Sequence, residues 1–165
     1  MPRKKQPRLY AAYGSNLSIH AMAMRCPQAR PVGSSVITDA RLVFRSVADI
    51  ERHTGSLTPI GLWEITPDCE RALDLYEGVS SGLYVKRVVG FDDGRQALVY
   101  VMQRGGILPP HARYFETIKA GYGDFGLDLK HLERARRHAQ RYRKPTADVL
   151  QHHARRATME RKHHV

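Results

Sequence analysis

The sequence has few cysteines and no long apolar run, and both absences exclude whole classes of protein. Its two cysteines, Cys26 and Cys69, form no CxxC pair, so neither a zinc site nor a disulfide framework is expected. No segment approaches the roughly 18 apolar residues of a membrane-spanning helix. The apolar stretch after the basic start is too short for the core of a signal peptide. We therefore expect a soluble cytoplasmic protein that does not insert into a membrane.

The sequence also has few acidic residues relative to basic ones, and its net charge is +11. Residues 1–8 carry four basic side chains and no acid, and residues 131–165 carry ten against three acids, so 9–130 is neutral overall. A basic tail attracts polyanions through counterion release, without sequence specificity. No aromatic stacking pattern accompanies this charge, so specific nucleic-acid binding is not expected. A solvated tail and a non-specific contact with an anionic partner both stay open.

The length of 165 residues predicts one domain with a core of its own. We divide the chain into a basic N-terminal arm (1–7), a folded domain (8–135) and a basic helical or disordered tail (136–165). Apolar residues become sparse beyond Pro145, which makes independent packing of the tail doubtful. Oligomeric state does not follow from these features.

Short runs of β-forming residues dominate the predicted domain. The runs are Arg8–Tyr13, Ser34–Thr38, Leu42–Arg45, Val47–Ile50, Leu57–Ile65, Leu83–Phe91 and Gln96–Gln103. Glu51–Ser56 is predicted to be a hairpin loop, and Asp92–Arg95 a second hairpin turn.

Helix signals are fewer than strand signals. Ser18 is a predicted N-cap for a helix through His20–Arg25, and Thr66-Pro67-Asp68 begins a helix that should end at Gly78. Two more helices are expected over Pro110–Ala120 and from Leu127 onward. The pattern favours an α+β fold, specifically a small mixed β-barrel with a few flanking helices.

Two segments are candidates for a functional site. In the first, Tyr13-Gly14-Ser15-Asn16-Leu17, a strand passes through glycine into a helix start, which aims several backbone N–H groups at one point. Such a turn suits a carboxylate or a developing oxyanion, although many turns of this kind are structural only. Ser15 lacks the second glycine of a G-x-S-x-G motif, and no histidine is marked as its base.

The second segment contains Glu77, which lies at the predicted C-terminus of a helix, directly before Gly78. The helix dipole there opposes a negative charge, so we expect a raised pKa for this carboxyl group. A base of that kind can take a proton from an ammonium group and later return it. A glutamate in this position is also compatible with a simple solvated side chain.

Together and in this order, the two segments resemble the γ-glutamyl cyclotransferase-like family, also called AIG2-like or butirosin-cyclotransferase-like. The resemblance covers about residues 8–135. It is carried by Tyr13–Leu17, Leu73–Val89, Ala97–Met102, Pro109–Tyr114 and the glycine-rich Gly121–Leu127. One departure is Ile50–His53, which stands where some family members have a Gly-Gly-x-Ala strand.

The resemblance implies an enzyme, a γ-glutamyl cyclotransferase of transferase or lyase type, that closes a γ-glutamyl group to 5-oxoproline and releases an amine. It implies Glu77 as the catalytic acid and base, and no metal or organic cofactor. It also implies a set of substrate-binding residues: Tyr13, Gly14, Ser15, Asn16, Leu17, Tyr84, Tyr100 and Tyr114. The identity of the small γ-glutamyl substrate stays open, and a non-catalytic binding module on the same fold is the alternative.

Overall fold

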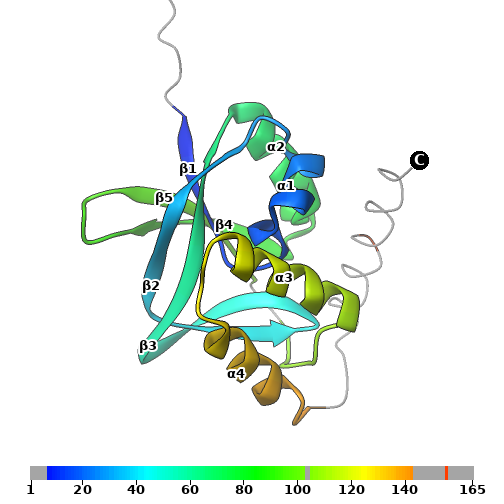
Figure 1. Ribbon diagram of the computed structural model, residues 1–165. Helices are drawn as coiled ribbons and strands as arrows, with labels where there is room; N and C mark the ends of the chain where they lie inside the picture. Colours follow the sequence, from blue (N-terminus) through cyan, green and yellow to red (C-terminus); the bar gives the residue numbers. More distant parts are fainter. Residues whose placement is uncertain (1–6, 103–104, 143–154, 156–165) are drawn as a thin grey trace, which may run out of the picture.

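The computed structural model describes residues 7–102, 105–142 and Arg155. Five strands form one sheet in the order β2-β3-β1-β5-β4 (Figure 1). They are β1 (Arg8–Ala12), β2 (Arg30–Arg45), β3 (Val47–Ile65), β4 (Tyr84–Gly90) and β5 (Gln96–Met102). The central strand β1 runs antiparallel to β3 and parallel to β5. Because β2 and β4 are the two edges, the sheet is open and "barrel" fits it loosely, but the predicted α+β class is confirmed.

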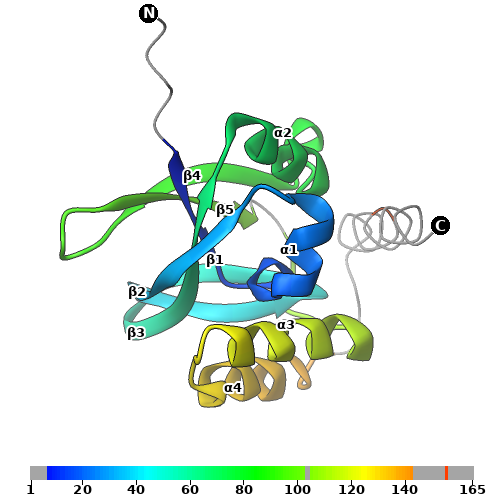
Figure 2. The ribbon, with the colours of Figure 1, turned by 45° about the horizontal axis from the view of Figure 1, so that its top comes forward.

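The helices are α1 (Ile19–Arg25), α2 (Pro67–Tyr76), α3 (Ala112–Asp124) and α4 (Leu129–Ala139), with short 3-10 turns η1 (Ser15–Leu17) and η2 (Val79–Ser81). Figures 1 and 2 show α1 between α2 and α3, with α4 packed beside α3. Among the described residues, no helix is both long and apolar enough to cross a membrane.

The predicted N-caps of α1 and α2 and the predicted end of α2 are confirmed, whereas α3 runs to Asp124 instead of ending at Ala120. Ser18 Oγ accepts a hydrogen bond from the Ala21 N–H at 3.1 Å, and Thr66 Oγ1 accepts one from the Cys69 N–H at 3.2 Å. Each hydroxyl thus satisfies an N–H group that the first turn of a helix leaves without a partner. Gly78 adopts a left-handed conformation (φ 65°) directly after Glu77, which ends α2 where predicted.

The predicted hairpin loop at Glu51–Ser56 is wrong, because these residues lie within β3. The chain reverses earlier, at Ser46, which has a φ of 67° and whose N–H donates to the Leu108 carbonyl. Near Thr38 and Ala40 the register of β2 against β3 shifts, and the Gly55 N–H donates to Asp39 Oδ1 at 2.9 Å. The turn-forming residues in this region therefore mark a shift in the β2–β3 register. They do not mark the end of a strand, which is what the sequence predicted.

Helix α3 packs closely against η1, so the turn that follows β1 contacts a helix about 100 residues later in the chain. Leu17 is fully buried, and a Cβ atom added to Gly121 would lie 2.4 Å from Leu17 Cβ and 2.6 Å from the Ser18 nitrogen. No side chain fits in that space. A glycine in α3 is therefore required for this packing, which holds η1 against the core.

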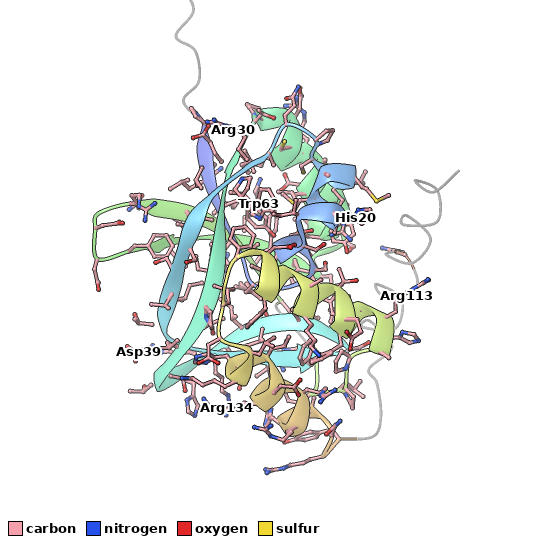
Figure 3. The ribbon with its side chains drawn as sticks, in the orientation of Figure 1. His20, Arg30, Asp39, Trp63, Arg113 and Arg134 are labelled. Carbon is pink, nitrogen blue, oxygen red and sulfur yellow. The ribbon has the colours of Figure 1, made fainter. Side chains whose placement is uncertain are left out.

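Helix α4 packs against β2 through Leu132, Ala135 and Ala139, all buried. Lys130, Arg134 and Arg137 are exposed, and Figure 3 shows Arg134 at the surface, whereas the guanidinium of Arg136 lies over the ring of Phe115. The helix crosses residue 135, where we placed the end of the domain, and its apolar stripe continues to Ala139. Most of the predicted tail lies outside the described residues.

Replacing Gly121 by alanine should destabilise the fold, since the added methyl group meets backbone atoms that cannot move aside. We expect a loss of about 2 kcal/mol or more in the free energy of unfolding, measured by urea denaturation. Gly123→Ala is the matched control, because its Cβ would meet no atom within 4 Å in the same helix. That variant should be unchanged or up to about 1 kcal/mol more stable. Equal effects of the two substitutions would contradict this account of the packing.

Candidate active site

One pocket brings together residues from six parts of the chain. Its internal space, including the open solvent at its mouth, is about 250 Å³. The wall comes from β1 and the turn after it, the start of β3, the end of α2, β4, β5 and α3. The lining residues are Tyr10, Tyr13, Gly14, Ser15, Asn16, Ala48, Glu77, Tyr84, Tyr100 and Tyr114. Of these ten residues, Glu77 is the one that carries a carboxyl group.

The turn that follows β1 forms one side of the pocket and is held from below. The Trp63 indole N–H donates to the Asn16 carbonyl oxygen at 2.9 Å, and Figure 3 shows this tryptophan inside the molecule. The first N–H groups of η1 have no acceptor within the turn itself, because a 3-10 helix bonds three residues back. Gly14, Ser15 and Asn16, which begin this turn, line the pocket.

Glu77 faces this turn from the end of α2. Its own N–H closes the helix by donating to the Leu73 carbonyl at 2.8 Å, and the residue is only 5% exposed. The Asn16 Nδ2 donates to Glu77 Oε1 at 3.3 Å and to the Tyr10 hydroxyl at 3.0 Å. A buried carboxylate and a turn with backbone donors thus share one small polar cavity.

Tyrosines make most of the remaining wall, and three of their hydroxyl groups donate to protein oxygens. Tyr84 donates to the Ala48 carbonyl at 2.6 Å, Tyr100 to Asp74 Oδ1 at 2.6 Å, and Tyr13 to the Tyr100 carbonyl. Burial raises the pKa of Tyr13 well above its ordinary value. Burial and the hydrogen bond to Asp74 raise the pKa of Tyr100 in the same direction. Both phenols therefore stay neutral.

Ala48 lines the pocket between two of these tyrosines. Its N–H donates to the Tyr114 hydroxyl at 2.9 Å, while its carbonyl accepts from Tyr84. A Cβ atom added to Gly14 would lie 3.1 Å from Ala48 Cβ and 3.5 Å from the Tyr114 hydroxyl. Glycine in the turn therefore keeps this side of the cavity open.

Behind Ala48, a buried ion pair fixes the start of β3. Asp49 accepts from Arg45 Nε at 2.8 Å and from the Met102 N–H at 2.9 Å, and Arg45 also reaches Glu51 at 2.9 Å. Burial raises the pKa of Asp49, and the hydrogen bond from Arg45 opposes that shift. These contacts tie the β2–β3 turn to β5 next to the pocket.

The structure brings eight of the nine predicted site residues to the pocket, and Leu17 packs into the core beneath the turn. Tyr10, Ala48 and Arg25 were not predicted. Tyr10 lies in the middle of β1, three residues before Tyr13, and carries no motif that would identify it. Ala48 contributes through its main chain, which carries no sequence signal. Arg25 contacts Asn16 without lining the cavity.

Ser15 is not arranged as the nucleophile of a hydrolase. Its hydroxyl lies 3.2 Å from the Tyr76 hydroxyl, and no histidine is among the ten lining residues.

The structure also gives no support for a cysteine nucleophile at Cys26 or for a metal site. Cys26 is buried, and burial raises its pKa to about 12. Within the described ranges, no group of three or more histidine, cysteine or acidic side chains is placed to hold a metal ion.

Similar proteins agree with the resemblance noted in the motifs. The chain is 28% identical to a γ-glutamylcyclotransferase of Homo sapiens and to one of Bos taurus, with 76% of each chain covered. A solved structure named γ-glutamyl cyclotransferase superimposes with a TM-score of 0.69 at 23% identity, over 88% of this chain and 97% of that one. No protein-family model matches. Sequence and fold together confirm the resemblance to the γ-glutamyl cyclotransferase-like family and support an enzyme of that type.

The buried tyrosines should make the protein less stable in alkali. An unfolded tyrosine ionises near pH 10, whereas Tyr13 stays neutral in the folded state. The unfolded state therefore loses a proton that the folded state retains, and stability falls as the pH rises above about 10. We expect the free energy of urea unfolding to fall between pH 8 and pH 11, and to fall less steeply in Tyr13→Phe. Parallel pH dependences in the two proteins would contradict the raised pKa.

Proposed function

We propose that this γ-glutamyl cyclotransferase-like chain cyclises the γ-glutamyl group of a small γ-glutamyl amide to 5-oxoproline and releases the free amine or amino acid. The substrate is held by the turn at Tyr13–Asn16 and by the tyrosine wall, and Glu77 moves the protons. No metal or organic cofactor takes part. We further propose that the enzyme works in the cytoplasm.

One observation carries this proposal: the buried side chain of Glu77 and the turn residues Gly14, Ser15 and Asn16 line the same cavity. The main chain of that turn supplies the N–H donors in the proposed reaction. Intramolecular aminolysis needs these two elements and no enzyme nucleophile, because the attacking nitrogen and the carbonyl carbon belong to one molecule. Holding a tethered pair in a reactive geometry replaces the cost of an encounter between two molecules. The pocket therefore has only to orient the γ-glutamyl chain and exchange protons with it.

In the proposed reaction, Glu77 first takes a proton from the α-ammonium group of the substrate. The freed amine attacks the γ-carbonyl carbon, and the carbonyl oxygen becomes an oxyanion that accepts from the N–H groups of Gly14–Asn16. Glu77 then returns the proton to the nitrogen of the departing amine as the C–N bond breaks. It next takes the second proton of the ring nitrogen and passes it to the released amine. The products are 5-oxoproline and the amine in its ammonium form, and the carboxylate is regenerated.

The tyrosine hydrogen bonds support this division of roles. Tyr13, Tyr84 and Tyr100 donate their hydroxyl protons to protein oxygens, so their rings serve as walls. These three hydroxyl protons are therefore directed at the protein, and we assign donation to the developing oxyanion to the main chain of the turn. Backbone donors in a folded turn need no reorganisation when charge develops, which favours them for an oxyanion.

The arrangement of the lining favours recognition of the γ-glutamyl group, because Glu77 and the turn residues Gly14–Asn16 lie together in the pocket. The leaving amine would then extend toward the mouth, where selectivity among γ-glutamyl amino acids and γ-glutamylamines would arise. A glutathione-specific enzyme is less favoured, because Asn16 stands where that branch shows a YGSL-type pattern.

Glu77→Gln should abolish turnover while leaving substrate binding largely intact, since glutamine keeps the shape but exchanges no proton. We expect kcat to fall by a factor of at least about 10². The assay measures 5-oxoproline release from a panel of γ-glutamyl amino acids, γ-glutamylamines and glutathione. Glu70→Gln is the matched control on the same helix, since Glu70 pairs with Lys86 and lines no part of the pocket.

Two outcomes would redirect this proposal. Turnover of Glu77→Gln at the parent rate would mean that another group moves the protons. If the parent releases no 5-oxoproline from any compound but binds one of them, the chain is a ligand-binding module on this fold.

Trimming the chain to residues 8–142 should leave the kcat and KM for 5-oxoproline release unchanged within about twofold. All pocket residues lie between Tyr10 and Tyr114, and the fold around them is complete within the retained segment. A protein that worked through its basic ends would instead lose binding to its partner. Loss of turnover after trimming, with the unfolding midpoint preserved, would show that an end of the chain takes part in catalysis.

A further inference from the structure

Arg25 is the last residue of α1 and does not line the pocket, yet it contacts two residues of the turn that does. Its Nη1 donates to Asn16 Oδ1 at 2.5 Å and lies 3.4 Å from Ser15 Oγ. The side chain is half-buried. It therefore approaches the site from behind the turn.

The Asn16 amide has a different partner on each side. Its oxygen accepts from Arg25, and its nitrogen donates to the Tyr10 hydroxyl and to Glu77 Oε1. The two ends of an amide are nearly equal in shape, so its orientation is decided by its partners. A guanidinium group has donors only, which requires the amide oxygen to face it. The amide N–H₂ group is then directed at the carboxylate.

A flipped amide would be unfavourable at both ends. Its oxygen would face the Glu77 carboxylate, and its N–H₂ group would face the guanidinium of Arg25. Either contact alone sets like partial charges against each other in a buried site, where such contacts cost more than in water. The cation at Arg25 thus selects one orientation of Asn16.

The guanidinium is itself held in place by α2. It stacks over the ring of Tyr76 at 3.8 Å from the ring centre, and Tyr76 directly precedes Glu77 in the chain. The Tyr76 hydroxyl also lies 3.2 Å from Ser15 Oγ. Arg25 therefore connects the ends of α1 and α2 to the same turn.

We propose that Arg25 is a positioning residue that holds the Asn16 amide with its N–H₂ group toward Glu77, and thereby fixes the Glu77 carboxylate relative to the substrate. The effect on catalysis rests on the cyclotransferase function proposed above. The effect on Asn16 does not. Because a displacement of about 1 Å can cost on the order of 10²-fold in rate, a residue outside the cavity can control turnover.

The kinetic test compares Arg25→Met, which keeps an apolar stem but has no donor, with Arg25→Lys and the parent. We expect Arg25→Met to lower kcat by a factor of about 10 or more, with KM changed less than about threefold. Lysine keeps a donor but lacks the planar fork that stacks on Tyr76, so its kcat should be intermediate. Arg71→Met is the matched control, because Arg71 is exposed on α2 and pairs with Asp68.

A double-mutant cycle separates this role from a merely structural one. If Arg25 acts through Asn16, Arg25→Met should cost much less in kcat when Asn16 is already alanine. An undiminished loss in that background would overturn the proposal, as would a parent-like kcat in Arg25→Met. Thermal unfolding of each variant shows whether a loss of rate reflects a loss of fold.

A second readout does not depend on activity. The side-chain amide signals of Asn16 in a ¹⁵N–¹H spectrum, assigned with Asn16→Ala, should be well dispersed in the parent and move toward ordinary solvent-exposed values in Arg25→Met. Unchanged signals would overturn the role of Arg25. If the parent releases no 5-oxoproline, the proposed function fails, but these signals still decide whether Arg25 orients Asn16.

Discussion

The hydrogen bond between Asn16 and Glu77 joins two segments 61 residues apart, and the site depends on that junction. On one side, the Asn16 carbonyl is fixed by Trp63 of β3. On the other, Glu77 is the residue at which α2 ends. The sheet, the first turn and the end of a helix therefore meet at one asparagine. Any displacement of α2 relative to β3 would separate the carboxylate from the backbone donors of the turn.

Local signals predicted much of this architecture from the sequence. The N-caps at Ser18 and Thr66 and the stop at Gly78 depend on neighbouring residues only, so they could be recognised without tertiary information. The chain reversal at Ser46 could not be recognised from neighbouring residues alone. A serine with positive φ is uncommon, and here it is held by a hydrogen bond to Leu108, a distant residue.

The same distinction applies to the site. Tyr13–Asn16 and Glu77 were found through motifs, because each carries its signal in a short segment. Arg25 and Ala48 were missed. Arg25 matters because α1 and α2 end side by side, and Ala48 contributes its main chain, which carries no residue-specific signal. Partners supplied by packing alone are visible only once the fold is known.

The turn after β1 is secured by Trp63 below, by Gly121 packing behind and by Arg25 at its flank. Its conformational entropy is thus lost when the chain folds, and little remains to be lost when a ligand arrives. A preorganised turn of this kind suits a small, flexible metabolite, which offers few contacts to offset the ordering of a loop. Because the turn is ordered when the chain folds, less free energy is lost in ordering it when a small ligand binds, and the ligand binds more tightly.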